Sequence, residues 1–442
     1  MKIKLIHPAV GKINGEKYVK SWTMYPLNLG VIASLTPKDV EVEFIDDRFE
    51  NISYDSDCDL VGLPVETYTA KRAYSISEGF RRLGVKTVLG GVHPTLMPQE
   101  AMLHSDAIVV GDAEKVWETL INDAKKGLLK KVYSSQREGK ELFTVKPDRS
   151  LFDMGQYLPI DLIETGRGCF FSCDFCAVTA ANQRTYRTKT VEDIIGEIQS
   201  VKRKNLYLVD DNFVSDFKRT KDLCEAMAQL GVRWTGQGSV NMADDEKLLH
   251  YLERSGCFNM LIGFESLNPK SLELMGKSWT SSKRKYEESI KKIRDHGITI
   301  YATFVFGYDT DTKDDFKRTI DFAIDQKFAI TAFNHLVPFP GTPLYSRLKD
   351  QGRLLYDDWW LRDGGKFGEA VFRPKNMTPQ ELTDGCFGCR EAFYQYGSIS
   401  HRLFDFKANF KNPLQGGYVA WINLFSRHEA KKRQGWPIGD II

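Results

Sequence analysis

The sequence predicts an α/β protein made of two strand–helix regions and a mainly helical C-terminal region. Short β-rich runs alternate with amphipathic helical patterns over residues 1–135 and again over residues 159–345. In the second region several helices end in a glycine just before the next strand, at Gly231, Gly256 and Gly297. Alternation of this kind is typical of parallel sheets covered by helices.

The first region has five β-rich runs, and a helical pattern over residues 69–84 lies between two of them. This order predicts a doubly wound parallel sheet, in which ligands bind beyond the carboxyl ends of the strands. Polar or glycine-rich stretches follow these strands, where such a ligand would lie. The predicted strands are 2–8, 40–46, 59–65, 86–91 and 106–111, and the stretches begin at Asp46, Pro64, Gly90 and Gly111.

The second region contains six strand–helix units, which predict an incomplete (β/α) barrel with catalytic groups at the carboxyl ends of its strands. We divide the chain into a first domain over 1–135, a linker over 136–158, the partial barrel over 159–345 and a helical cap over 346–442. The predicted barrel strands are 160–166, 205–211, 232–238, 259–266, 298–307 and 330–337.

The charges of the chain nearly balance, with 61 Lys and Arg against 59 Asp and Glu and a net charge of +2. This balance gives no sign of a surface for nucleic acid or membrane. No apolar run reaches the roughly 18 residues of a transmembrane helix, and the apolar stretch at the N-terminus is too short for a signal peptide. We therefore expect a cytoplasmic protein whose cysteines stay reduced.

Three of the eight cysteines lie within eight positions, at Cys169, Cys173 and Cys176, directly after the first barrel strand. Thiolates on a short loop suit zinc or an iron–sulfur cluster. A closed tetrahedral zinc site needs a fourth ligand, and the distant pair Cys386 and Cys389 is either that partner or a buried pair. Three ligands alone leave one metal position open. The isolated cysteines Cys58, Cys224 and Cys257 are expected to be buried apolar residues.

The cysteine motif, with Phe175 before its last cysteine, resembles that of radical S-adenosylmethionine (SAM) enzymes. The strand ends at 209–213, 262–266 and 304–312 and the stretch 338–345 resemble the subfamily with an N-terminal cobalamin-binding-type domain. The resemblance covers nearly the whole chain. It implies a 4Fe–4S cluster whose open iron binds SAM, and a 5′-deoxyadenosyl radical that attacks an unactivated carbon. A reductant such as flavodoxin or ferredoxin would supply the electron.

The resemblance also implies roles for the residues at the strand ends, each of which has a structural alternative. Polar residues after the second barrel strand would accept bonds from the SAM ammonium group, or else cap a helix. A carboxylate after the fourth strand would bind ribose, or else form a salt bridge, and a glycine would let backbone approach the ligand, or else form a turn. Two residues of the cysteine loop would pack on adenine. The polar residues are Asp210, Asp211 and Asn212, and the carboxylate is that of Glu265. The glycine is Gly307, and the two residues of the cysteine loop are Phe175 and Ala177.

The first domain resembles a cobalamin-binding domain but departs from the Asp-x-His-x-x-Gly signature of older members. Arg48 stands where that signature has its histidine, and arginine cannot ligate cobalt. We expect Gly90, Gly91 and His93 to lie at the cofactor site, with His93 more plausible as a turn residue than as a ligand. Two interpretations stay open: cobalamin binds without a protein imidazole, or the domain is a vestigial scaffold that shapes the substrate channel.

The function that the resemblance favours is cobalamin-dependent C-methylation of a small molecule, with a lipid or tetrapyrrole as candidate substrate. The first alternative is a radical cyclase, oxidase or coupling enzyme without methyl transfer. The second, from another class, is an iron–sulfur sensor or a zinc-stabilised binding module. In the cap, the basic stretch 426–434 is a docking site or a solvated helix face, and four aromatic residues contact substrate or pack the cap: Trp359, Trp360, Tyr394 and Tyr396.

Overall fold

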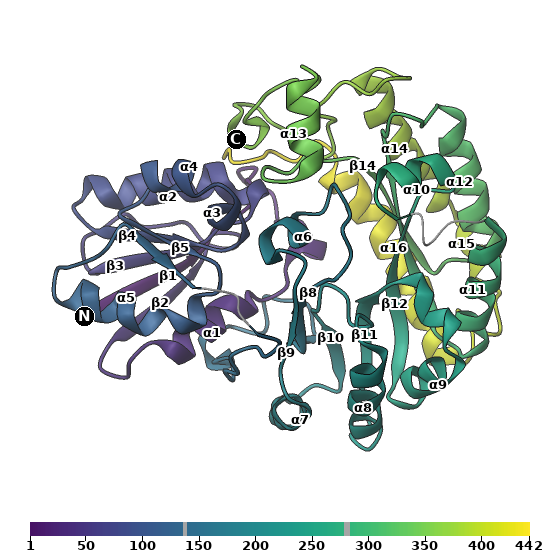
Figure 1. Ribbon diagram of the computed structural model, residues 1–442, viewed down its shortest axis with the longest axis horizontal. Coiled ribbons are helices and arrows are strands. Elements are labelled where there is room, and N and C mark those ends of the chain that lie inside the picture. The colour runs from purple at the N-terminus through teal and green to yellow at the C-terminus, as the bar shows by residue number, and fades with distance from the viewer. Residues whose placement is uncertain (136–138, 278–282) are drawn as a thin grey trace.

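The computed structural model describes residues 1–135, 139–277 and 283–442 and has the predicted two-sheet architecture (Figure 1). Each of the two domains is built on a six-stranded parallel sheet. The C-terminal helices lie beside the second sheet, and the last residues return to the first domain. Within the described ranges, no helix combines the length and the apolarity that crossing a membrane requires.

The first sheet has the strand order β2-β1-β3-β4-β5-β6, and every neighbouring pair is parallel. Helices cover both faces, as the doubly wound prediction requires. The strands are β1 (Lys2–His7), β2 (Glu41–Asp46), β3 (Leu60–Pro64), β4 (Lys86–Gly90), β5 (Ala107–Val110) and β6 (Val132–Ser134). The helices are α1 (Leu27–Leu35), α2 (Ala70–Arg82), α3 (Val92–Leu96), α4 (Pro98–Leu103) and α5 (Trp117–Lys125).

The two faces of this sheet form separate hydrophobic cores because successive side chains of a strand point to opposite sides. Leu60 and Val88 join the core under α1 and α5, which also contains Trp117. The next residues along the same strands, Val61 and Leu89, join the core under α2. The near-continuous apolar runs in the sequence are therefore those of a sheet buried on both sides.

The second sheet has the order β14-β13-β12-β11-β10-β7, and its six parallel strands match the six predicted ones. Among the described strands, β7 and β14 each pair on one side only, so the barrel is open. The strands are β7 (Asp161–Ile163), β10 (Asn205–Leu208), β11 (Arg233–Gly238), β12 (Cys257–Glu265), β13 (Thr299–Phe306) and β14 (Ile330–His335). The outer helices are α7 (Val191–Ser200), α8 (Phe217–Met227), α9 (Glu246–Arg254), α10 (Pro269–Leu274), α11 (Lys283–Asp295) and α12 (Asp314–Asp325).

The sequence did not predict a small antiparallel ribbon formed by β8 (Gly166–Gly168) and β9 (Tyr186–Thr188). The cysteine segment and the short helix α6 (Ala177–Asn182) lie between these two strands. The ribbon thus fixes both ends of the segment that carries the three cysteines. Three residues per strand are too few to produce a recognisable period in the sequence.

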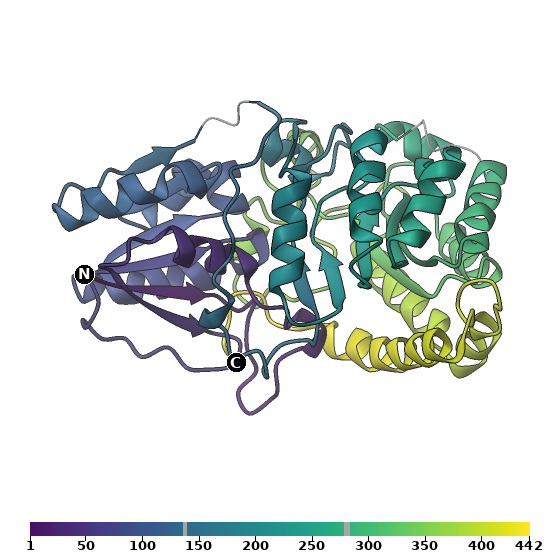
Figure 2. The same ribbon diagram turned by 90° about the horizontal axis from the view of Figure 1, so that it is seen from below.

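The C-terminal region comprises α13 (Pro343–Asp350), α14 (Pro379–Phe393), α15 (Tyr396–Leu403) and α16 (Pro413–Arg433). Helix α14 packs against β14, and α16 runs along one edge of the molecule (Figure 2). The chain then crosses back to the first domain, where Trp436 Nε1 donates a hydrogen bond to the Gly11 carbonyl at 2.8 Å. The region therefore connects both domains as well as covering the second.

Three of the four aromatic residues singled out in this region are packing residues. Trp359 and Trp360 are buried in the α2 core of the first domain, and Tyr394 is buried against β14, where its hydroxyl donates to Thr331 O at 3.1 Å. Tyr396 is exposed. Of the four aromatic residues expected either to contact substrate or to pack the cap, Trp359, Trp360 and Tyr394 therefore have the packing role. Of the predicted linker, residues 136–138 lie outside the described residues.

Candidate functional site

The three cysteines follow β8 on a loop whose entry requires a glycine. Gly168 has φ +93°, and a Cβ atom there would lie 2.0 Å from the Thr185 carbonyl oxygen. The loop ends where Cys176 caps the N-terminus of α6. Cys173 is buried, whereas Cys169 and Cys176 are partly exposed. Burial raises the pKa of the Cys173 thiol to about 12, because the cost of desolvating a thiolate outweighs the attraction of the nearby Lys277.

Asp174, within the motif, fixes the middle of the loop to the rest of the barrel. Its Oδ1 accepts a hydrogen bond from the Tyr308 hydroxyl at 2.5 Å, and its Oδ2 accepts one from Arg347 Nη1 at 2.7 Å. Its backbone amide donates to the Met275 carbonyl at 3.2 Å, and its carbonyl accepts from the Leu344 amide at 3.0 Å. Four contacts to three other segments hold the loop, and the sequence analysis missed this residue.

The acidic end of β10 contacts the cysteine loop. Asp211 Oδ2 accepts from the Gly168 amide at 2.7 Å, and Asn212 Nδ2 lies 3.6 Å from Cys169 Sγ, to which it donates. The Asn212 Oδ1 atom is buried without a hydrogen-bond partner among the described residues. These contacts replace the helix-cap alternative, because the cap of α8 is Asp216, which accepts from the Arg219 amide.

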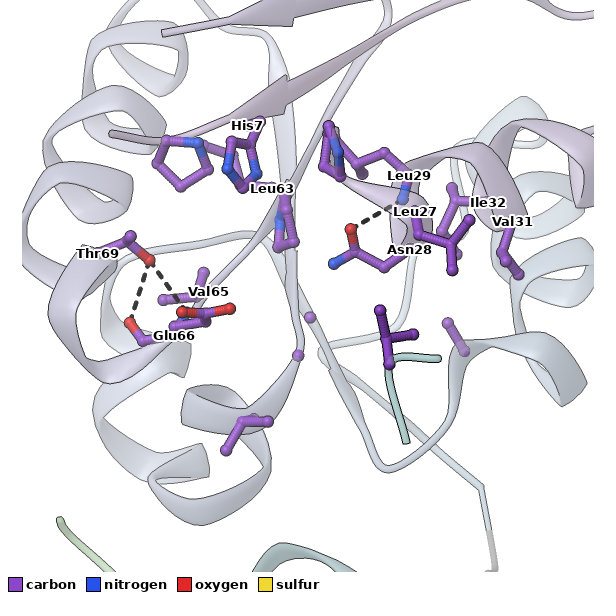
Figure 3. A pocket seen from close by; sticks show the side chains of 18 of the residues that line it. His7, Leu27, Asn28, Leu29, Val31, Ile32, Leu63, Val65, Glu66 and Thr69 are labelled. Carbon is purple, nitrogen blue, oxygen red and sulfur yellow. Dashed lines mark hydrogen bonds between the residues drawn. The ribbon is translucent and has the colours of Figure 1, made fainter. Parts of the chain in front are cut away.

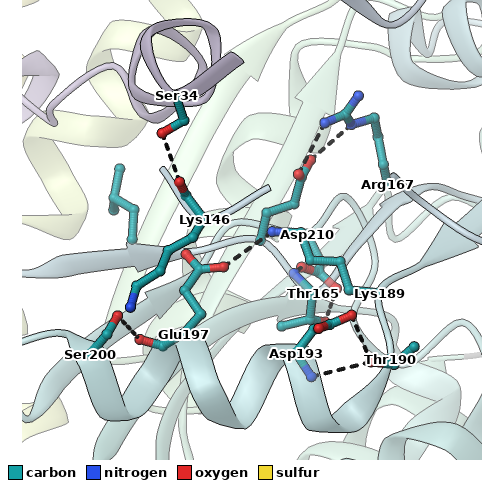
Figure 4. A network of polar contacts seen from close by, with 12 residues as sticks. Ser34, Lys146, Thr165, Arg167, Lys189, Thr190, Asp193, Glu197, Ser200 and Asp210 are labelled. Carbon is teal, nitrogen blue, oxygen red and sulfur yellow. Dashed lines mark hydrogen bonds and ion pairs between the residues drawn. The ribbon is translucent and has the colours of Figure 1, made fainter. Parts of the chain in front are cut away.

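Asp210 has a different environment from its two neighbours. It is fully buried and accepts from the amide and the hydroxyl of Thr165, at 2.7 and 2.5 Å (Figure 4). Burial outweighs these hydrogen bonds and raises the pKa of Asp210 to about 6. Its carboxylate therefore joins the ends of β7 and β10, and binding of the SAM ammonium group by Asp210 stays a prediction.

Glu265 lies at the end of β12 in a strained backbone conformation, with φ +63°. Its Oε1 forms an ion pair with Lys277 Nζ at 2.7 Å, and both side chains are buried. Burial opposes the charge of Lys277, but the Glu265 carboxylate outweighs it and raises the pKa of Lys277. Non-glycine residues with positive φ cluster at functional sites, which supports a role for Glu265 beyond a surface salt bridge.

The remaining predicted SAM residues divide into two groups. Phe175 packs edge-on against Tyr308 with ring centroids 6.5 Å apart, and Ala177 is the first residue of α6, so both lie at the cysteine loop. Gly307 is crowded by side chains: a Cβ atom there would lie 2.8 Å from Leu382 and 2.9 Å from Phe372. The close approach at Gly307 thus serves packing of the C-terminal region, and an approach of its backbone to a ligand stays a prediction.

A cavity of about 760 Å³ opens between the carboxyl edge of the first sheet and the entry to the cysteine loop. The ends of β1, β3, β4 and β5 line it from the first domain, and Glu164, Arg167 and Asp211 line it from the second. Figure 3 shows part of the wall, with His7, Leu63, Val65 and Glu66 at the strand ends and Leu27–Leu29 of the facing segment. Ligand sites of doubly wound sheets lie at this edge.

Gly90 and Gly91 line this cavity, as expected, but His93 does not. His93 is fully buried, and its two ring nitrogens lie 3.2 Å from Thr67 Oγ1 and 2.9 Å from Glu100 Oε1. Because both nitrogens already have partners inside the first domain, His93 is a structural residue. Arg48 lies at the cavity wall, where its guanidinium pairs with Asp46 at 2.6 Å.

The sequence analysis also missed His7, which lines the cavity at the end of β1. Its Nδ1 is buried and has no hydrogen-bond partner among the described residues. Burial, together with the nearby charge of Arg48, lowers the pKa of His7 to about 3, so the ring is neutral near pH 7. A strand-end position was the only signal in the sequence that could have indicated it.

The other five cysteines are buried, as expected for isolated cysteines. Cys386 and Cys389 lie in the hydrophobic core of the second domain, and burial raises the pKa of the Cys389 thiol to about 12. This environment favours the buried pair over a fourth metal ligand. Over the described parts of the chain, no group of three or more Cys, His, Asp or Glu side chains is placed to hold a metal ion.

Residues 163–323 match the model of the Radical SAM superfamily. The chain is 32% identical over 391 residues to bacteriochlorophyllide d C-12(1)-methyltransferase of Chlorobaculum tepidum, covering 86% of this chain and 84% of that protein. The chain belongs to the radical SAM superfamily. The bacteriochlorophyllide d C-8(2)-methyltransferase of the same organism is a second relative of this radical SAM enzyme, 30% identical over 76% of this chain and 78% of that protein.

Solved structures confirm the fold of this radical SAM enzyme beyond the matched region. A structure of the cobalamin-dependent SAM radical enzyme OxsB with aqua-cobalamin bound aligns with a TM-score of 0.68 at 16% identity, over 97% of this chain and 72% of that one. The radical SAM methyltransferase TsrM of Kitasatospora setae, with cobalamin and a [4Fe-4S] cluster bound, aligns with a TM-score of 0.64 at 17% identity. That alignment covers 87% of this chain and 81% of the TsrM chain.

The residues of the loop fit the cluster that the superfamily carries. Three thiols on one anchored loop supply the donors, and cysteine thiolates are the usual ligands of 4Fe–4S clusters. The Asn212 amide already donates to Cys169 Sγ, and hydrogen bonds to sulfur are a known way to tune such clusters. Three donors leave one iron free for SAM.

Proposed function

We propose that this radical SAM enzyme is a cobalamin-dependent C-methyltransferase. The observation that carries the proposal is the cavity of about 760 Å³ between the first sheet and the entry to the cysteine loop. A scaffold without a ligand would not need an open volume there, because protein interiors are close-packed. Its walls come from both domains, so a bound corrin would lie beside the segment that leads into the cluster loop.

The residues of the second domain would hold the cluster and SAM. Cys169, Cys173 and Cys176 would ligate the cluster, and Asp174 keeps their loop in place. When bound, the cluster would supply the electron that cleaves SAM. Asn212 Oδ1 would accept from the SAM ammonium group, and the adenine would lie near Phe175 and Ala177. The second oxygen of Glu265, beyond the one paired with Lys277, would accept from a ribose hydroxyl.

The residues of the first domain would hold the corrin. Gly90 and Gly91 line the cavity with backbone atoms because they have no side chains. Position 91 requires glycine, since its φ is +107° and a Cβ atom would lie 2.9 Å from the Val65 carbonyl oxygen. When bound, cobalamin would carry the methyl group to the substrate. Arg48 supplies fixed positive charge at the wall and is neutralised by Asp46, so the cavity does not hold a free cation there.

The substrate class that we propose is a tetrapyrrole of the bacteriochlorophyllide type. Two relatives at 30% and 32% identity are named for methylation of bacteriochlorophyllide d. The alignments extend over 86% and 76% of this chain. The proposed substrate class rests on sequence similarity to these relatives, whereas the proposed binding of cobalamin rests on the cavity.

Corrin retention tests the proposal. The anaerobically reconstituted protein should carry hydroxocobalamin through gel filtration in stoichiometric amount. Val92→Trp should abolish retention without loss of iron, because Val92 is partly exposed and lines the cavity. Leu103→Trp is the matched control, since Leu103 is exposed and is not part of the cavity wall. Absence of corrin in the wild type would refute the proposal, and equal retention in Val92→Trp would place the corrin elsewhere.

A further inference from the structure

Helix α16 runs along one edge of the molecule (Figure 2) and exposes several large apolar side chains. Leu414 is 78% exposed, Trp421 52% and Leu424 50%. These positions are seven and three residues apart, so they share one face of the helix. Trp421 also stacks on Phe425 with ring centroids 5.4 Å apart. Single exposed apolar residues are ordinary, but a periodic row of large ones is not.

Another exposed aromatic residue lies before the N-terminal end of α16. Phe406 is 71% exposed and packs against Phe410, with ring centroids 6.0 Å apart. Phe410 in turn lies against Gly416 on the buried face of the helix, where a Cβ atom would come within 2.3 Å of its ring. Phe406 is therefore a separate exposed residue of the 404–411 loop. We call the exposed row of Leu414, Trp421 and Leu424 the α16 stripe.

The opposite face of α16 fixes the orientation of the stripe. Asn423 Nδ2 donates to the Ala329 carbonyl at 2.8 Å, and Gln415 Nε2 donates to the Gly297 carbonyl at 3.1 Å. Val419, between them, is buried in the main core. Because polar anchors and core contacts hold this face, the helix cannot rotate to bury Trp421 and Leu424 without breaking them. The stripe faces solvent as a built feature of the fold.

Charge on the helix is one-sided, although the whole chain is nearly neutral. Glu429 is the only acidic residue of α16, and it is buried, accepting from the Ser21 amide at 2.7 Å. The last turn carries Lys431, Lys432 and Arg433. Lys431 has a surface partner in Glu391 at 3.3 Å, a type of pair worth only ~0–1 kcal/mol. Such pairs do not prevent a cation from also facing an anionic surface.

We propose that the α16 stripe docks the protein on the surface of an anionic lipid bilayer. A helix that exposes Leu and Trp, and whose one acidic residue is buried, combines apolar contact with attraction to anionic lipid, the two contributions that hold proteins at a membrane surface. A symmetric dimer through the same face is less compatible with the charges, because two-fold symmetry would bring the basic turns of both copies into one interface. The proposal does not depend on the reaction that the enzyme performs.

Vesicle flotation of the full-length protein tests the proposal. With phosphatidylcholine vesicles that contain phosphatidylglycerol, the wild type should float, and it should float less with phosphatidylcholine alone or at raised salt. Combining Trp421→Ala with Leu424→Ala should lower the bound fraction by about tenfold or more, because two large side chains no longer enter the interface. Leu103→Ala is the control, since it removes a leucine of the first domain that is even more exposed, at 73%.

Three results would overturn the proposal: a wild type that stays with the soluble fraction, a double variant that floats as well as the wild type, or equal loss with Leu103→Ala. A concentration-dependent dimer in sedimentation velocity that the double variant abolishes would assign the stripe to a second copy of the chain instead. Unchanged circular dichroism and melting temperature establish that the variants are folded. Flotation with loss on the double substitution, in a monomeric protein, supports the proposal.

Discussion

Arg167, directly before the cysteine loop, forms an ion pair with Glu114 of the first domain, with Nη2 and Oε1 2.8 Å apart. The same guanidinium pairs with Asp112 at 3.1 Å and with Glu164 at 2.8 Å (Figure 4 labels the arginine). Asp112 and Glu114 follow β5 and lie at the cavity wall. One side chain thus connects the wall of the proposed corrin cavity to the entry of the proposed cluster loop.

This connection should be energetically measurable. Glu114→Gln removes one charge-assisted hydrogen bond but leaves Arg167 its other two carboxylates, so the free energy of unfolding should fall by roughly 1.5–3 kcal/mol. Glu118→Gln, at an exposed glutamate four residues away, should change it by less than about 0.5 kcal/mol. Urea unfolding measures both. Equal effects in the two variants would mean that the Arg167–Glu114 pair does not stabilise the fold.

The cluster assignment predicts a sharp contrast between two sets of cysteines. Replacing Cys169, Cys173 or Cys176 by alanine should remove the roughly four irons of the reconstituted protein and abolish SAM cleavage. Replacing Cys386 and Cys389 together should spare both, because these two residues are core residues of the second domain. Iron analysis and 5′-deoxyadenosine formation provide the measurements. Loss of iron in the double variant alone would show that the ligands are wrongly assigned.

Asn212 should tune the cluster and bind SAM. Removing its amide in Asn212→Ala takes a hydrogen bond from Cys169 Sγ, so the reduction potential of the cluster should become more negative. SAM affinity should fall about tenfold or more from the lost acceptor. Asn205→Ala, at the exposed start of the same strand, should change neither. A redox titration and a binding titration that leave Asn212→Ala indistinguishable from the wild type would contradict both roles.

The buried pair of Glu265 and Lys277 predicts a large loss of stability when the cation alone is removed. Lys277→Met leaves a buried carboxylate without its partner, which should cost about 3–5 kcal/mol. Lys270→Met, at an exposed lysine on α10, should cost less than about 0.5 kcal/mol. Denaturant unfolding compares the two variants. A small cost in Lys277→Met would indicate that Glu265 reaches solvent.

The lowered pKa of His7 should make the free energy of unfolding depend on pH. Its pKa is about 3 in the folded protein, below its ordinary value of 6.5, so the unfolded chain binds more protons between these values. The unfolding free energy should therefore fall as the pH is lowered from about 7 to about 5, because the unfolded state gains the proton. In His7→Gln this fall should be smaller, which urea unfolding at both pH values measures. Identical slopes would show that His7 titrates normally in the folded protein.

The sequence predicted the features that depend on local pattern. Five strands of the first sheet and the six strands of the second follow from short apolar runs, but the short edge strand β6 was not predicted. The cysteine loop follows from its spacing and from its place after a strand. The sequence did not predict the contacts that join distant segments. The Arg167–Glu114 pair spans 53 residues, and Asp174 binds Tyr308 and Arg347 from far along the chain. No periodicity or residue spacing in the sequence indicates such contacts.

Gly91, Gly307 and His93 show that the sequence around a residue does not predict what the residue contacts. Gly91 and Gly307 both have positive φ, yet one lines a cavity and the other packs against Leu382. His93 stands in a glycine-rich strand end, but the start of α3 turns it into the first domain, toward Thr67 and Glu100. In each case the sequence correctly predicted that the residue lies at the carboxyl edge of its sheet. Side-chain direction depended on the neighbours that the fold supplies.

The most direct test of the account is the set of products formed from SAM during turnover with a bacteriochlorophyllide substrate. Methylation through a corrin consumes one SAM as methyl donor and cleaves another. We therefore predict that S-adenosylhomocysteine and 5′-deoxyadenosine accumulate together, in equal amounts, and that a deuterated methyl group from labelled SAM appears in the product. If 5′-deoxyadenosine forms with the substrate consumed but no S-adenosylhomocysteine and no labelled methyl group appear, the enzyme is a radical cyclase, oxidase or coupling enzyme and the methyltransferase account is wrong.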